Sequence, residues 1–170
     1  MESGIKRDNI MNIKLLFFDV DGTLTDGRIY MGPNGEAMKA FDVKDGYAIK
    51  EILPQHHIIP VIITGRESSI VANRACELGI TELYQGKHDK LSTVRDLKDK
   101  YEADKNECAY FGDDVLDIIG MEQCGIVGCP ADAVDEVRRI SNYICKNNGG
   151  HGAAREFIEW LVAQKRYKRA

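Results

Sequence analysis

The sequence lacks any apolar run approaching the roughly 20 residues that a membrane-spanning helix requires. Its longest purely apolar runs contain only a handful of residues, which argues against a helical membrane protein. The first residues, Met1-Glu2-Ser3-Gly4-Ile5-Lys6-Arg7, also lack the apolar centre of a secretory signal. We therefore expect a cytoplasmic protein with no membrane partner.

The cysteines and glycines lack the spacings of several common cofactor sites. No Cys-x-x-Cys occurs among the five cysteines, so neither a zinc ribbon nor a thioredoxin-type redox pair is supported. We expect these cysteines to be reduced and buried: Cys76, Cys108, Cys124, Cys129 and Cys145. No Gly-x-Gly-x-x-Gly follows the first expected strand and no Gly-Lys-Ser/Thr occurs. Dinucleotide chemistry and ATP-dependent kinase chemistry are therefore unsupported.

The sequence also contains fewer basic residues than acidic ones. Lys and Arg total 23 against 27 Asp and Glu, and the net charge of −4 provides no field that would attract nucleic acid. A length of 170 residues with 44% apolar and 29% charged residues is typical of one compact domain. We expect a single domain over residues 1–170, with a poorly ordered lead-in at 1–10.

Short apolar runs alternate with segments of helical spacing along most of the chain. The run at 14–20 (Lys-Leu-Leu-Phe-Phe-Asp-Val) is typical of a strand buried on both faces. Further strands are expected at 60–64, 108–112, 125–127 and 143–144. Helices are expected at 45–53, 68–78, 90–101, 115–124, 132–140 and 152–164. This order predicts an α/β fold, a Rossmann-like parallel sheet with helices on both faces.

One segment interrupts the alternation just after the first strand. Residues 28–31 and 36–41 read as strands on either side of Gly32-Pro33-Asn34-Gly35, and Asn-Gly between such runs is a strong hairpin signal. A lone hairpin is only marginally stable in water, so its apolar side chains need a cover. These side chains are Ile29, Met31, Met38 and Phe41. Since the insertion is too short for a cap domain, we expect the hairpin at 28–41 to contact a partner subunit.

Acidic residues follow the apolar strands, where ligands bind in an open parallel sheet. Asp19 and Asp21 follow the first strand, and Asp113 follows the strand at 108–112, with Asp117 one turn further on. Carboxylates converging there would repel one another unless a cation neutralised them, and oxygen ligands suit Mg²⁺. We therefore predict a magnesium site made by Asp19, Asp21 and Asp113.

This pattern predicts phosphoryl transfer. A carboxylate of Asp19 can attack phosphorus in line and form an aspartyl phosphate. Asp21 can protonate the leaving alkoxide and later deprotonate the attacking water. The Thr64 hydroxyl, the Gly65 amide and the Lys90 ammonium can bind the phosphoryl oxygens and stabilise the charge of the transition state.

The run Asp19-Val20-Asp21-Gly22-Thr23-Leu24-Thr25 resembles the first motif of the haloacid dehalogenase-like phosphatases. Thr64, Lys90 and Gly112-Asp113-Asp114 fall where the second, third and fourth motifs of that superfamily would lie. Asp-Gly-Arg-Ile-Tyr-Met-Gly and Lys-Ala-Phe-Asp-Val-Lys-Asp-Gly-Tyr resemble the small capless phosphatases of 3-deoxy-D-manno-octulosonate 8-phosphate and of nonulosonate 9-phosphates. The resemblance covers residues 11–164. It implies a Mg²⁺-dependent phosphatase of a small phosphorylated sugar acid, acting in lipopolysaccharide biosynthesis.

The resemblance also implies a homotetramer, in which the hairpins join and the C-terminal segments reach neighbouring active sites. The run Gly149-Gly150-His151-Gly152 then becomes a candidate flexible loop, although His151 stands where relatives often have Arg. The residues that would contact the sugar acid are Asp21, Asp42, Val43, Lys44, Asp45, Gly46, Gly65, Arg66, Arg74 and Lys90.

The positions of the two arginines in this set, Arg66 and Arg74, independently support a role in binding. Arg74 lies on the apolar side of its expected helix, four residues after Ile70 and four before Leu78, where a charge requires either a partner or a substrate. An arginine at the edge of that stripe with its head in water fits the same spacing. Arg66 lies beside the phosphate site, where its planar fork suits a phosphate or a carboxylate. We expect His56, His57 and His88 to be surface residues.

Three alternatives to an octulosonate 8-phosphate phosphatase remain. The nonulosonate 9-phosphate phosphatases carry Glu at the position of Arg66, so Arg66 favours the octulosonate substrate. A phospho-acceptor receiver domain combines similar residues but places its acceptor Asp after a middle strand of the sequence. A catalytically silent phosphatase-like module would lack some motif residues, whereas all four motifs are filled here.

Overall fold

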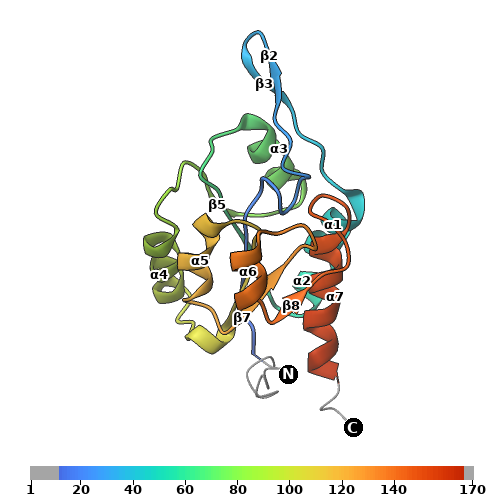
Figure 1. Ribbon diagram of the computed structural model, residues 1–170. Helices are drawn as coiled ribbons and strands as arrows, with labels where there is room; N and C mark the ends of the chain where they lie inside the picture. The colour runs from blue at the N-terminus through green and yellow to red at the C-terminus, as the bar shows by residue number, and fades with distance from the viewer. Residues whose placement is uncertain (1–11, 167–170) are drawn as a thin grey trace.

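The computed structural model describes residues 12–166, and the lead-in at 1–10 lies outside them. Its centre is a sheet of six parallel strands in the order β5-β4-β1-β6-β7-β8 (Figure 1). The strands are β1 (Leu15–Phe18), β4 (Ile59–Ile63), β5 (Glu82–Tyr84), β6 (Cys108–Phe111), β7 (Ile126–Cys129) and β8 (Tyr143–Ile144). No helix within the described range has the length and apolar character needed to cross a membrane.

The central strand β1 is fully buried and pairs with β4 on one side and β6 on the other. The register sets Phe18 opposite both Ile62 and Phe111, so the three strands end at nearly the same level. Because all three are parallel, the loops after them open at one edge of the sheet.

Helices cover both faces of the sheet, which confirms the predicted fold class. Alternate residues of a strand point to opposite faces. Leu16 and Phe18 pack against helices on one face, whereas Leu15 and Phe17 pack on the other. The helices of the first face are α1 (Val43–Tyr47), α2 (Leu53–Gln55), α3 (Ser69–Glu77) and α7 (Ala153–Arg166). Those of the second face are α4 (Lys90–Lys100), α5 (Val115–Met121) and α6 (Asp135–Ile140).

Three local expectations differ from the structure. The helix expected at 45–53 begins at Val43, because Asp42 caps it by accepting from the amides of Lys44 and Asp45, and it continues to Gln55 through a π-helical turn, Ala48–Ile52. Strand β5 lies where the sequence pattern predicts no strand, and its three residues include a glutamate. The helix expected at 132–140 begins only at Asp135, after a turn. A short 3₁₀ turn, Lys105–Glu107, precedes β6.

The hairpin consists of β2 (Tyr30–Gly32) and β3 (Gly35–Met38), and it projects beyond the sheet edge at the top of Figure 1. Met31 and Met38 are 66% and 57% exposed, so apolar side chains do lie uncovered on it. Phe41 differs from the expectation, because it packs against the core of the domain.

All five cysteines are free, and four of them are buried. Cys76 is exposed, contrary to expectation, while its neighbour Ala75 in α3 points into the core.

Candidate active site

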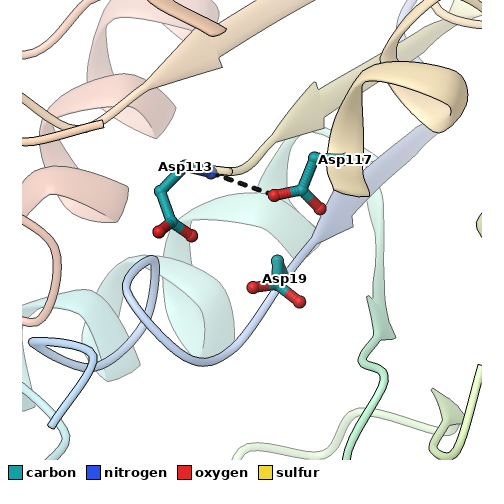
Figure 2. A group of neighbouring side chains, drawn as sticks. All are labelled: Asp19, Asp113 and Asp117. Carbon is teal, nitrogen blue, oxygen red and sulfur yellow. Dashed lines mark hydrogen bonds between the residues drawn. The ribbon is translucent and has the colours of Figure 1, made fainter. Parts of the chain in front are cut away.

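Three carboxylates meet at the open edge of the sheet (Figure 2). Asp19 follows β1, Asp113 follows β6, and Asp117 lies in the first turn of α5. Each offers an oxygen that lies within 4.8 Å of the other two. The sequence predicts Asp21 as the third converging carboxylate, whereas the third member of this group is Asp117; a role of Asp21 in holding the cation remains a prediction. The carboxylate of Asp21 instead pairs with the ammonium of Lys39.

The loop after β1 holds Asp113 in place. Gly22 has a φ of +92°, which favours glycine, and its missing side chain leaves room for the Asp113 carboxylate. The hydroxyl of Thr23 donates to Asp113 Oδ1 at 2.6 Å. The first motif therefore supplies a charged side chain and also the backbone shape that accommodates a second one.

Asp117 is almost completely buried and is surrounded by donors. Its Oδ1 accepts from Lys90 Nζ at 2.7 Å and from the Tyr110 hydroxyl at 2.9 Å. Its Oδ2 accepts from the amides of Asp113 and Asp114 at 3.1 and 3.2 Å. With two donors on each oxygen, Asp117 fixes Lys90 and the loop after β6 and has little capacity left for a cation.

Lys90 joins this group from the start of α4. Its ammonium lies 2.7 Å from Asp19 Oδ1 and 2.7 Å from Asp117 Oδ1. Burial alone lowers the pKa of Lys90, but the two carboxylates outweigh burial, so the pKa is raised and the side chain stays charged.

Burial acts in the opposite direction on the carboxylates. It raises the pKa of Asp19 to about 7, with a further contribution from the charge of Asp117. It also raises the pKa of Asp113 to about 7, even though the hydroxyl of Thr23 opposes the shift. The three carboxylates of Asp19, Asp113 and Asp117 share the single ammonium of Lys90, and a divalent cation would supply the further positive charge that they need. Oxygen ligands at the end of an open cavity fit Mg²⁺, and Asp19 and Asp113 are the residues with capacity to hold it.

A cavity of about 240 Å³ opens beside these groups. Its lining consists of Asp19, Asp21, Thr64, Gly65, Arg66, Lys87, His88, Lys90, Asp114, Leu116 and Asp117. The structure therefore brings together the predicted catalytic residues Asp19, Asp21, Thr64 and Lys90, with Gly65 and Arg66 beside them. His88 is exposed, as expected, and it also lines this cavity.

The other residues predicted to contact the sugar acid do not line this cavity. Asp42, Asp45, Gly46 and Arg74 line a smaller, more apolar hollow beside Phe41. Asp45 accepts from the amide of Arg155 at 2.8 Å, and burial raises its pKa to about 6. The guanidinium of Arg74 lies 2.8 Å from Glu77 and 5.7 Å from the ring centre of Phe41. Val43 and Lys44 are exposed next to this hollow. Contact between these residues and a substrate remains a prediction.

The segment expected to be a flexible loop is packed against the first motif. A Cβ on Gly149 would lie 1.9 Å from the carbonyl oxygen of Gly22, and one on Gly150 would lie 2.5 Å from Asp26 N. The amide of Gly150 also donates to the carbonyl of Thr23 at 3.3 Å. His151 beside them is exposed, and its contact with a substrate likewise remains a prediction.

Sequence reasoning noted Asp117 but gave it no role. A signal was present in the spacing, because Asp114 caps α5 and an acid three residues later lies in the first turn of that helix. Lys87 and His88 had no comparable signal, since they lie in the turn before α4 and line the cavity only through the fold.

Comparison with known proteins assigns the class. A family model described as haloacid dehalogenase-like hydrolase matches residues 70–157, which is more than half of the chain. With its parallel sheet and acidic edge, the chain belongs to the haloacid dehalogenase-like hydrolases.

Within this class, the chain belongs to the family of the 3-deoxy-D-manno-octulosonate 8-phosphate phosphatases. It is 45% identical over 151 residues to the phosphatase KdsC of Escherichia coli K12, covering 89% of this chain and 80% of that protein. The Yersinia pestis phosphatase structure matches with a TM-score of 0.89 and 40% identity, over 94% of this chain and 85% of that one. The Moraxella catarrhalis enzyme in complex with magnesium, phosphate and KDO matches with a TM-score of 0.88 and 38% identity, over 94% and 91%. The cobalt-bound Haemophilus influenzae enzyme gives 0.88 and 35%, over 92% and 91%.

Proposed function

We propose that the protein is a Mg²⁺-dependent phosphatase that hydrolyses 3-deoxy-D-manno-octulosonate 8-phosphate to the free sugar acid and phosphate. The observation that carries this proposal is the group of carboxylates at Asp19, Asp113 and Asp117, beside a cavity lined by Asp19 and Lys90, in a chain 45% identical to such enzymes. That degree of identity favours a catalytically active phosphatase and argues against a receiver domain or a catalytically silent module.

The residues of the cavity divide the chemistry between them. An oxygen of Asp19 attacks phosphorus, the bond to the sugar oxygen breaks, and Asp21 gives its proton to that oxygen. Water then attacks the phosphorus of the aspartyl phosphate, Asp21 takes a proton from that water, and Asp19 is released as a carboxylate. Asp19 and Asp113 would hold Mg²⁺, which would supply positive charge to neutralise the phosphoryl oxygens.

Three cavity residues bind the transferring group in this proposal. Thr64 and Gly65 follow β4 and offer a hydroxyl and an amide to the phosphoryl oxygens. The ammonium of Lys90 lies 2.7 Å from the nucleophilic Asp19. There it stabilises negative charge on the Asp19 carboxylate and on the phosphoryl group. Asp117 keeps Lys90 in that position.

The position of Arg66 favours the octulosonate substrate. Arg66 lines the cavity beside Asp21, and the nonulosonate 9-phosphate phosphatases carry Glu at the matching position. Hydrolysis of a nonulosonate 9-phosphate is the second candidate function, because the sequence runs quoted above resemble both groups.

A homotetramer in the cytoplasm, acting in lipopolysaccharide biosynthesis, completes the proposal. The exposed Met31 and Met38 of the hairpin support a subunit interface, since such apolar surface is commonly covered in an assembly. Five free cysteines are consistent with a reducing compartment.

The test is a comparison of kcat/KM for the two sugar acid phosphates with Mg²⁺ present. We expect a clear preference for the octulosonate 8-phosphate. A preference for the nonulosonate 9-phosphate would select the second candidate, and no phosphate release from either would contradict both.

A further inference from the structure

The ammonium of Lys39 lies at the base of the hairpin, with 1% of its side chain exposed. A charge buried to this degree is costly unless it is paired. Lys39 Nζ donates to Asp21 Oδ1, and it lies 2.8 Å from Glu36 Oε1. Burial alone lowers the pKa of Lys39, but the two carboxylates outweigh burial, so the pKa is raised.

Glu36 is itself tied to the loop after β4. Its Oε2 accepts from the hydroxyl of Ser68, the residue that caps α3, at 2.5 Å. The guanidinium of Arg66 lies 3.8 Å from Glu36 and 3.9 Å from Asp21. The hairpin base is therefore bonded to residues that follow β1 and to residues that follow β4.

Within residues 12–166, Lys39 is the cation that lies closest to the Asp21 carboxylate, and Arg66 is the next. Without Lys39, Asp21 and Glu36 would be two carboxylates facing one site, with only the more distant and half-exposed Arg66 between them. Their repulsion would turn Asp21 away from the cavity.

We propose that Lys39, anchored by Glu36, is a positioning residue that holds the Asp21 carboxylate where it can exchange a proton with the sugar oxygen and with water. This inference rests on the acid–base role of Asp21 in the proposed function. It makes the hairpin base part of the catalytic apparatus, independently of any role the hairpin tip has in assembly.

The test uses two substrates that differ in their need for a proton. The sugar acid phosphate releases an alkoxide, which needs the proton of Asp21, whereas 4-nitrophenyl phosphate releases a stabilised phenolate that does not. For Lys39→Met we expect the first-turnover rate with the sugar acid phosphate to fall by about tenfold to a hundredfold. The burst of nitrophenolate should change by less than about threefold. Lys39→Arg should recover part of the loss, because it restores the positive charge.

Controls separate positioning from folding and from the proposed function. Asp21→Asn should give the same pattern with a larger loss. Lys100→Met removes an ion pair with buried Glu82 away from the cavity, so it should lower stability without producing the pattern. Glu36→Gln, which weakens the anchor, should give a smaller version of the pattern and serves if Lys39→Met does not fold.

Equal losses for the two substrates, or no loss in Lys39→Met, would overturn the proposal while the role of Asp21 stands. If Asp21→Asn also shows no selective loss, the acid–base role of Asp21 is what fails, and the positioning role fails with it.

Discussion

Gly22 lies directly against the carboxylate of Asp113, since a Cβ on Gly22 would be 2.1 Å from Asp113 Oδ2. The two residues come from the loops after β1 and β6, so the close approach joins the two central strands at the proposed cation site. Any side chain at position 22 must displace the Asp113 carboxylate.

We expect Gly22→Ala to lower both Mg²⁺ affinity and turnover. The added methyl group displaces Asp113, and the φ of +92° adds strain of about 1 kcal/mol. Gly79→Ala is the matched control, because Gly79 has a φ of +72° but nothing within 4 Å of its added Cβ. Calorimetric titration of Mg²⁺ should show the loss for Gly22→Ala only, while urea unfolding should show the strain in both. Unchanged Mg²⁺ affinity in Gly22→Ala would contradict the role given to this contact.

Asp19→Asn should abolish turnover while the protein remains folded. The amide cannot form the aspartyl phosphate, but it has nearly the same shape and keeps a carbonyl oxygen for Lys90. Phosphate release is the measurement, with circular dichroism to verify the fold. Asp96→Asn, at an exposed position of α4, should behave as the wild type. Near-normal activity in Asp19→Asn would show that the nucleophile is a different residue.

Asp113→Asn and Asp117→Asn should fail in different ways. Asp113→Asn should weaken Mg²⁺ binding, because it removes the charge of a proposed ligand. Asp117→Asn should mainly destabilise the fold, by roughly 3–5 kcal/mol, because it breaks a buried pair with Lys90 and leaves donors without acceptors. Urea unfolding and Mg²⁺ titration of both variants measure this difference. A larger loss of Mg²⁺ affinity in Asp117→Asn than in Asp113→Asn would make Asp117 the ligand.

The Glu82 cluster predicts a pH dependence of stability. Glu82 is buried and accepts from Lys100, Tyr101 and Tyr84. Burial raises its pKa, but these donors outweigh burial, so the pKa lies below the ordinary 4.5. A depressed pKa stabilises the fold above the unfolded-state pKa, and this contribution is lost as the pH falls through the folded-state pKa.

Glu82→Gln should therefore cost roughly 1–3 kcal/mol at pH 7 and progressively less below about pH 4.5. Urea unfolding at several pH values measures this, with the exposed Glu51→Gln as control. A difference between wild type and Glu82→Gln that stays constant over this range would rule out the ionised form of Glu82 as its source.

Arg66→Glu should shift the ratio of kcat/KM values toward the nonulosonate 9-phosphate. It should also lower both values, because a third carboxylate would join Asp21 and Glu36. The ratio is the informative quantity, and an unchanged ratio would remove Arg66 from substrate selection.

The sheet could be predicted because its central strands are continuous apolar runs. Leu15, Phe17 and their neighbours leave no polar face, and that pattern occurs in buried parallel strands. Strand β5 could not be predicted in this way. Its Glu82 is polar in sequence and becomes compatible with burial only through donors from α4 and from Tyr84, which the fold brings together.

The site likewise contains residues whose positions could be predicted from the sequence and residues whose positions could not. Asp19, Thr64 and Asp113 each directly follow a predicted parallel strand, or lie one residue beyond it, so their proximity at one edge of the sheet could be predicted. The pairing of Asp21 with Lys39 could not, because it depends on where the fold places the base of the hairpin relative to the loop after β1. The donors on Asp117 likewise come from α4, β6 and the loop after β6, and no short stretch of sequence contains all of them.

The central position of β1 has a consequence for synthesis on the ribosome. Thr23 and Asp113, which are hydrogen-bonded in the finished protein, lie 90 positions apart in the chain. A nascent chain exposes the first motif early, but it cannot assemble the cation site before β6 has emerged and paired beside β1. The cation can therefore bind and stabilise the fold only late in translation, after β6 has paired with β1.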